Sequence, residues 1–144
     1  YLTLKIPPRN RIETLLNIAK SHYYKSDFFQ AETEAKEARV LAFDADQIFD
    51  IELFLANVLY NTRKVEEAIQ KYRLLIKDYP KRAQKENVEM SIVVALEESQ
   101  RLNEAIEVLK NMKDYYPEPD FIDLKIKSLE QRKDNMPGSR GLRK

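Results

Sequence analysis

Residues 51–80 read IELFLANVLYNTRKVEEAIQKYRLLIKDYP, and this stretch decides the fold class. In its first half Ile51, Leu55 and Leu59 stand four residues apart, so they form one apolar stripe along a helix. A polar segment follows, and a second apolar stripe then runs toward Pro80, which lacks the N–H group that a continuing helix needs. The stretch therefore predicts two amphipathic helices joined by a short turn.

The helix pair recurs at an interval of 37 residues. Ala31, Ala68 and Ala105 mark the second helix of each copy, and Pro80 and Pro117 close two of the copies at the same interval. Repetition at a fixed period of this size is typical of a solenoid of stacked units. The pattern predicts helices over residues 10–24, 27–42, 45–61, 64–78, 83–98, 102–115 and 119–133.

This pattern resembles the tetratricopeptide repeat. The residues that carry the resemblance are small side chains within the helices and prolines at the repeat ends: Ala19, Ala56, Val93, Ala31, Ala68, Ala105, Pro80 and Pro117. The three repeats cover about residues 12–48, 49–85 and 86–122. The resemblance implies an all-α fold, a right-handed superhelix of three helix pairs over residues 10–133, with a C-terminal capping helix at 119–133.

The chain departs from the family in its period and at its turns. The interval of 37 residues exceeds the usual period of about 34. Ser26, Arg63 and Gln100 stand in turns where the family usually has glycine, and a left-handed conformation there costs each of them on the order of 1 kcal/mol. Longer repeats that close in Tyr-Pro are similar to those of bacterial envelope proteins, such as the lipoprotein of the outer-membrane barrel assembly machine and the periplasmic cell-division coordinators. The compartment stays open between the cytoplasm and a bacterial periplasm or envelope.

The composition excludes several classes of chemistry. The 144 residues carry a net charge of +1, contain no cysteine and have only two glycines, both near the C-terminal end. Disulfides and thiolate metal sites are therefore excluded, and no glycine-rich loop is present to hold a nucleotide phosphate. The sole histidine, His22, falls on the packing face of the first helix, where we expect a hydrogen-bonded core residue rather than a general base. We expect no enzyme activity, no cofactor and no metal site.

The resemblance implies that the first helix of each repeat lines a concave groove, which binds a peptide or a helix of another protein. The groove-facing register of the family maps onto these positions: Leu16, Lys20, Tyr23, Tyr24, Leu53, Asn57, Tyr60, Asn61, Met90, Val94, Glu97 and Glu98. Aliphatic side chains beside tyrosines suit an apolar or aromatic ligand segment, and Asn57 is placed to hydrogen-bond its backbone. Glu97 and Glu98 disfavour recognition of a carboxylate terminus. The alternative is that the same residues, Leu16 and Leu53 above all, are core between helices.

The two ends of the chain carry different signals. Residues 1–9 alternate apolar and polar side chains before two prolines, which predicts an extended segment that either occupies the groove or is the remnant of a preceding element. Because the chain opens at Tyr1 rather than methionine, we expect it to be a piece of a longer protein. Residues 125–144 carry a net charge of +5, and 134–144 are predicted to form a basic, flexible tail. No aromatic side chains accompany these charges, so we expect no nucleic-acid binding, and membrane contact only in a full-length context.

These observations predict a non-catalytic adaptor or scaffold whose concave face takes a peptide or helix of a partner protein. Two alternatives stay open. In one, the module assembles with itself, because the apolar helix at 119–133 stacks on another copy. In the other, the chain is an accessory domain of a larger enzyme or of an envelope assembly protein.

Overall fold

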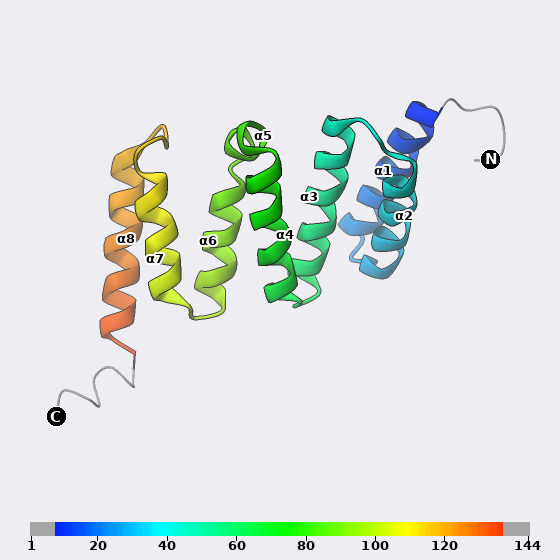
Figure 1. Ribbon diagram of the computed structural model, residues 1–144. Coiled ribbons are helices and arrows are strands. Elements are labelled where there is room, and N and C mark those ends of the chain that lie inside the picture. Colours follow the sequence, from blue (N-terminus) through cyan, green and yellow to red (C-terminus); the bar gives the residue numbers. More distant parts are fainter. Residues whose placement is uncertain (1–7, 137–144) are drawn as a thin grey trace. The chain divides into compact units, whose positions relative to one another are not determined.

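The computed structural model describes residues 8–136, and this part of the chain is helical without any strand (Figure 1). The helices are α1 (Pro8–Tyr24), α2 (Phe28–Leu41), α3 (Ala45–Asn61), α4 (Val65–Asp78), α5 (Pro80–Lys85), α6 (Val88–Glu98), α7 (Leu102–Met112) and α8 (Pro119–Asp134). They fall into two compact units that divide after Lys85, so that α1 to α5 form unit 1 and α6 to α8 form unit 2. The predicted all-α fold class is confirmed.

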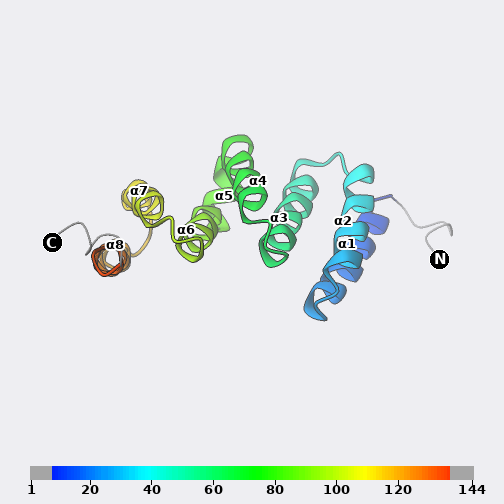
Figure 2. The ribbon, with the colours of Figure 1, turned by 90° about the horizontal axis from the view of Figure 1, so that it is seen from below.

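Unit 1 is built from two antiparallel helix pairs. Helix α1 packs against α2 and α3 packs against α4, while α2 also contacts α3 (Figures 1 and 2). The face of α2 that meets its neighbours carries Ala31, Ala35 and Ala38, all fully buried. Side chains this small let two helix backbones approach closely. Larger residues from α1 and α3 then fill the space around them, among them Leu15 and Phe54.

Unit 2 continues the same construction with three helices. Helix α7 packs against α6 on one side and against α8 on the other. The buried residues of unit 2 include Ala105 and Leu109 from α7, Leu96 from α6, and Ile122 and Leu129 from α8. Helix α8, which follows the last complete pair, thus supplies apolar cover for α7.

The register of the repeat is confirmed by burial. Ala31, Ala68 and Ala105 are each fully buried, and they occupy equivalent places in α2, α4 and α7. The small residues of the first helices behave in the same way, because Ala19 and Ala56 are also fully buried. The spacing of 37 residues therefore reports a true structural period.

The turns within the helix pairs adopt the left-handed conformation that their position predicts. Ser26, Arg63 and Gln100 have φ angles of 63°, 67° and 60°. None of them is glycine, so each turn stores on the order of 1 kcal/mol of backbone strain. The helix pair that each turn closes has to offset this strain by its packing.

The helix predicted over 83–98 is wrong, because two helices, α5 and α6, stand in its place. The break falls at Asn87, which has a left-handed backbone with a φ of 55°. Asparagine tolerates this conformation better than most residues. Helix α5 begins directly at Pro80 and is held by Arg82, whose guanidinium lies 2.8 Å from both Asp46 and Asp50 of α3. Since these contacts tie α5 to unit 1, the chain ends that helix before it starts the next.

Other boundaries shift by less. Helix α1 begins at Pro8, and α7 ends at Met112 instead of 115, because the N–H groups of Tyr115 and Tyr116 turn back onto the carbonyl oxygen of Met112. Most of the predicted N-terminal segment (1–9) and basic tail (134–144) lies outside the described residues, which begin at Pro8 and end at Met136. The right-handed superhelix over 10–133 stays a prediction.

Candidate partner-binding surfaces

An aromatic cluster occupies the end of α1 in unit 1. The ring of Tyr23 lies 5.7 Å from Tyr24, 5.5 Å from Phe28 and 5.5 Å from Phe54 of α3, measured between ring centroids. The first two contacts are edge-to-face, an arrangement that aromatic rings favour. We call these four residues the tyrosine cluster. Tyr24 is its outermost member, with 82% of its surface exposed.

A hydrogen-bonded asparagine fixes the tyrosine cluster to α3. The Asn61 amide nitrogen donates to the Tyr23 hydroxyl at 2.7 Å and to the backbone carbonyl of Asn57 at 2.8 Å. Burial raises the pKa of Tyr23 above its ordinary value, so its hydroxyl stays neutral near pH 7. Both donors of the Asn61 amide are thereby engaged within the protein.

Asn57 stands one turn before Asn61, and a hydrogen bond from a buried residue of α4 holds its side chain. The hydroxyl of the buried Tyr72 donates to Asn57 Oδ1 at 2.6 Å. Burial raises the pKa of Tyr72 far above its usual range, which keeps this hydroxyl a donor. With the oxygen committed, the amide nitrogen of Asn57 has no hydrogen-bond partner among the residues that the structure describes. The result is an oriented donor on a partly exposed side chain.

The remaining predicted residues of unit 1 divide between surface and packing. Lys20 is exposed, whereas Leu16, Leu53 and Tyr60 are partly buried. Leu16 packs against the core around α1 and α2, as does Tyr23. The alternative that some of the predicted residues are core between helices therefore stays open for Leu16.

Unit 2 carries ion pairs where unit 1 carries aromatic rings. Glu97 of α6 lies 3.0 Å from Lys125 Nζ and 2.6 Å from an Arg132 nitrogen, both cations coming from α8. These residues border an open hollow of about 540 Å³, whose lining also includes Val94 and Glu98. The carboxylate of Glu97 is thus neutralised, and the hollow has no net charge from these side chains. Met90, the fourth predicted residue of α6, is partly buried.

The contacts of Lys125 and Arg132 with Glu97 were not predicted from the sequence, in which both residues belong to the basic C-terminal region at 125–144. Their separation of seven residues puts them on one face of α8, and that spacing is the signal available in the sequence. Phe28, Phe54 and Tyr72 were also missed. All three are aromatic residues that contact predicted residues: Phe28 and Phe54 contact Tyr23, and Tyr72 contacts Asn57. These contacts depend on how the helices pack, which the sequence pattern does not give.

The structure also bears on chemistry and membranes. His22 is partly exposed rather than a core residue, with its ring nitrogens 3.7 Å from Asp27 and 3.5 Å from Glu34. Within residues 8–136, no three histidine, aspartate or glutamate side chains gather in a way that would hold a metal ion. No helix in that same part of the chain combines the length and the apolar character needed to cross a bilayer.

A family model of the tetratricopeptide repeat matches residues 55–82, from the second half of α3 through α4 to the start of α5. The match coincides with the stretch from which the fold class was predicted, and it confirms the resemblance there. The chain therefore carries a tetratricopeptide repeat, a helical fold that is generally non-catalytic and typically binds other proteins. No curated protein matches the chain. The similarity to bacterial envelope proteins stays a prediction.

Proposed function

We propose that unit 1 binds an extended segment of another protein across α1 and α3. The observation that carries the proposal is the oriented amide nitrogen of Asn57, which lies on the same helix face as Asn61 and so beside the tyrosine cluster. A peptide backbone is rich in carbonyl acceptors, so a donor at a fixed place on a partly exposed side chain supplies one directional contact. An apolar or aromatic side chain of the same segment packs on Tyr24.

The chemistry of this surface favours a neutral or apolar ligand segment. Its aromatic residues are uncharged, and Lys20 is the only charged side chain among the predicted residues of unit 1. Tyrosine is suited to such a role because it offers a large contact area and loses little conformational entropy when it binds. The ligand's affinity then comes from burial on the tyrosine cluster, and its direction comes from the hydrogen bond to Asn57.

Unit 2 is proposed as a separate contact surface with a different preference. Val94 supplies an apolar centre, and the ion pairs of Glu97 with Lys125 and Arg132 form a rim around it. Such a rim is screened by water and salt, so we expect it to select among ligands more than to strengthen binding. Met90 and Glu98 complete the predicted set on α6.

The test begins with a peptide selected from a displayed library on the immobilised full chain. Binding of that peptide is then measured by fluorescence anisotropy for the wild type and for two variants, Tyr24→Ala and Asn57→Asp. The aspartate keeps an acceptor for Tyr72 but removes the amide donor, so we expect the fold to be retained. We expect each variant to weaken binding by roughly tenfold, a typical effect of one lost contact residue.

Phe29→Ala serves as the matched control, since Phe29 is an aromatic residue with the same exposed fraction, 82%, outside the proposed surface. The proposal is overturned if Tyr24→Ala and Asn57→Asp bind the peptide as tightly as the wild type while Phe29→Ala binds it more weakly. The peptide site would then lie on another face of unit 1.

A further inference from the structure

Helix α2 carries a stripe of exposed apolar residues on its outer face, which is interrupted by Thr33 and Lys36. Phe29 and Val40 are 82% and 84% exposed, and they stand eleven residues apart. At 3.6 residues per turn this separation leaves them within about 20° of each other around the helix axis. Phe43, just beyond the C-cap of the same helix, is 85% exposed. Single exposed apolar residues are common, whereas a stripe of large ones along one helix marks an interaction surface.

The repeat itself does not require apolar residues at these positions. The residues 37 positions further along are Glu66, Lys77 and Pro80, and those of the third repeat are Asn103, Asp114 and Pro117. The equivalent places in the second and third repeats thus carry charged, polar or proline residues. Only the first repeat presents large apolar side chains there, so the stripe serves something other than the stacking of repeats.

We infer that the outer face of α2 docks against α2 of a second copy of this chain, with the two helices antiparallel about a two-fold axis near Lys36. Phe29 and Phe43 each stand seven residues from Lys36 in the sequence, one on either side. An antiparallel arrangement centred on Lys36 therefore places Phe29 of one copy against Phe43 of the other. A surface that is complementary to itself in this way produces an isologous, closed dimer.

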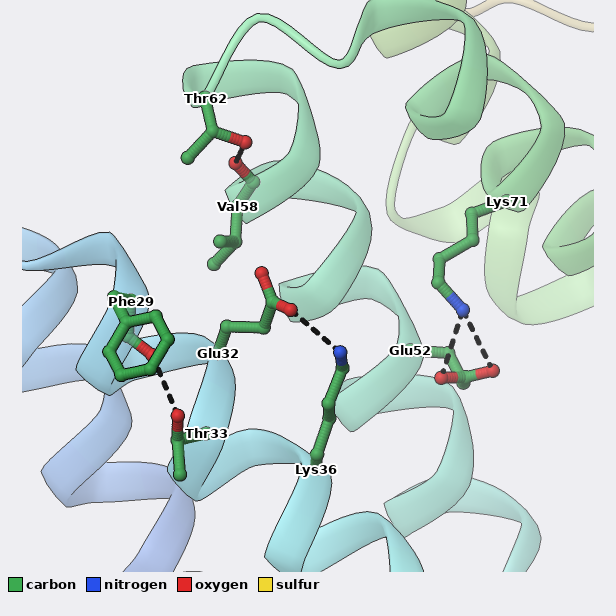
Figure 3. Close-up of polar contacts among 8 residues, drawn as sticks. All are labelled: Phe29, Glu32, Thr33, Lys36, Glu52, Val58, Thr62 and Lys71. Atoms are coloured by element: carbon green, nitrogen blue, oxygen red, sulfur yellow. Dashed lines mark hydrogen bonds and ion pairs between the residues drawn. The ribbon is translucent and has the colours of Figure 1, made fainter.

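The charges along α2 fit the same arrangement. Glu32 in the first half of the helix forms an ion pair of 2.6 Å with Lys36 at the centre, and Figure 3 shows the pair projecting from α2 next to Phe29 and Thr33. Arg39, seven residues after Glu32, lies on the same flank of the helix. The two antiparallel flanks then bring Glu32 of each copy near Arg39 of the other. Within residues 8–136 the Arg39 side chain makes one ion pair, at 4.0 Å from Glu52, and this long contact leaves its guanidinium able to pair with Glu32 of the other copy.

The Phe29–Phe43 contact supplies the test. Phe29→Glu combined with Phe43→Glu places two carboxylates opposite each other at both ends of the proposed antiparallel contact. Sedimentation equilibrium should show a dimer for the wild type and an increase of at least roughly 100-fold in the dimer dissociation constant for the double variant. Helix content by circular dichroism should stay unchanged, because both replaced side chains are exposed.

Leu124→Lys is the matched control, since Leu124 is an exposed apolar residue of α8 in unit 2. A wild type that stays monomeric at all concentrations overturns the inference and points to a different protein as the occupant of the stripe. Dissociation by Leu124→Lys, with the double variant still dimeric, overturns it in favour of assembly through α8.

Disulfide cross-linking tests the two-fold axis. Because the chain has no cysteine, an introduced thiol is the only one that can form a disulfide. Lys36→Cys places one thiol of each copy beside the proposed axis, where mild oxidation should join two chains by a disulfide within minutes. Arg73→Cys, at the equivalent position of the second repeat, should cross-link at least roughly tenfold more slowly because it meets its counterpart only by random collision. Equal rates for the two variants would overturn the antiparallel arrangement.

Discussion

Units 1 and 2 present different chemistry at equivalent positions of the repeat. Tyr23 and Tyr60 in unit 1 correspond to Glu97 in unit 2, because successive members of this series stand 37 residues apart. In unit 1 the first of these residues, Tyr23, belongs to the tyrosine cluster and accepts a hydrogen bond from Asn61. In unit 2 the equivalent position holds a carboxylate between two cations of α8. The backbone repeat therefore sets where a side chain stands, and the side chain alone determines which ligand chemistry that place accepts.

The largest expected effect tests whether the two units share one packing design. Ala68→Leu in α4 and Ala105→Leu in α7 each add three carbon atoms to a fully buried position. Overpacking of this kind costs about 1–3 kcal/mol, and the equivalent registers predict similar losses in both units. The free energy of unfolding, measured by urea denaturation and followed by circular dichroism, checks the result.

Gln70→Leu is the control for the same helix, because Gln70 is exposed and its replacement should leave the unfolding free energy nearly unchanged. A large loss for Ala68→Leu and none for Ala105→Leu would show that the units are packed by different rules.

The next effect is a gain in stability at the turns. Arg63→Gly and Gln100→Gly replace left-handed residues, one in each unit, and each should raise the free energy of unfolding by up to about 1 kcal/mol. The gain is reduced by the additional freedom that glycine gives the unfolded chain. Lys64→Gly is the matched control, since Lys64 has an ordinary φ of −90° and should lose stability or stay unchanged.

The sequence predicted these turns and the buried alanines because both follow from local, periodic signals. The left-handed positions recur with the period, and Ala31, Ala68 and Ala105 follow the same count. The break at Asn87 was not predicted, because no glycine or proline interrupts residues 83–98. It arises beside a long-range contact, in which Arg82 reaches carboxylates on α3 more than thirty residues earlier in the chain.

The candidate sites were predictable only in part for the same reason. The mapped positions on α1, α3 and α6 do carry the aromatic rings, the asparagines and the carboxylates. Their partners come from other helices, such as Tyr72 for Asn57 and Arg132 for Glu97. A repeat pattern predicts which face a residue occupies, whereas it does not predict which of several nearby polar groups will pair across helices.

A smaller expected effect is a salt-dependent loss of stability, which distinguishes the ion pairs of unit 2 from the neutral hydrogen bonds of unit 1. Glu97→Gln removes the charge that Lys125 and Arg132 share, and it should lower the free energy of unfolding by about 0.5 kcal/mol at low salt. At about 1 M salt the loss should nearly vanish, because exposed charges are screened. Glu98→Gln is the control from the next position, where no contact with these cations is made. A loss independent of salt would mean that Glu97 acts through packing.

The smallest effect concerns the pH dependence of unit 2. Burial raises the pKa of Glu89, whose carboxylate accepts a hydrogen bond from the Tyr115 hydroxyl. The folded state then holds this proton more tightly than the unfolded state, so stability falls as the pH rises through the interval between the unfolded and the folded pKa. Glu89→Gln keeps an acceptor for Tyr115 and removes the titration. The variant should therefore melt at a higher temperature than the wild type at pH 7, while the two should melt alike below the unfolded pKa of about 4.3. Thermal unfolding across that pH range, followed by circular dichroism, measures the difference, and a gap that widens on acidification would reverse the sign assigned to the burial of Glu89.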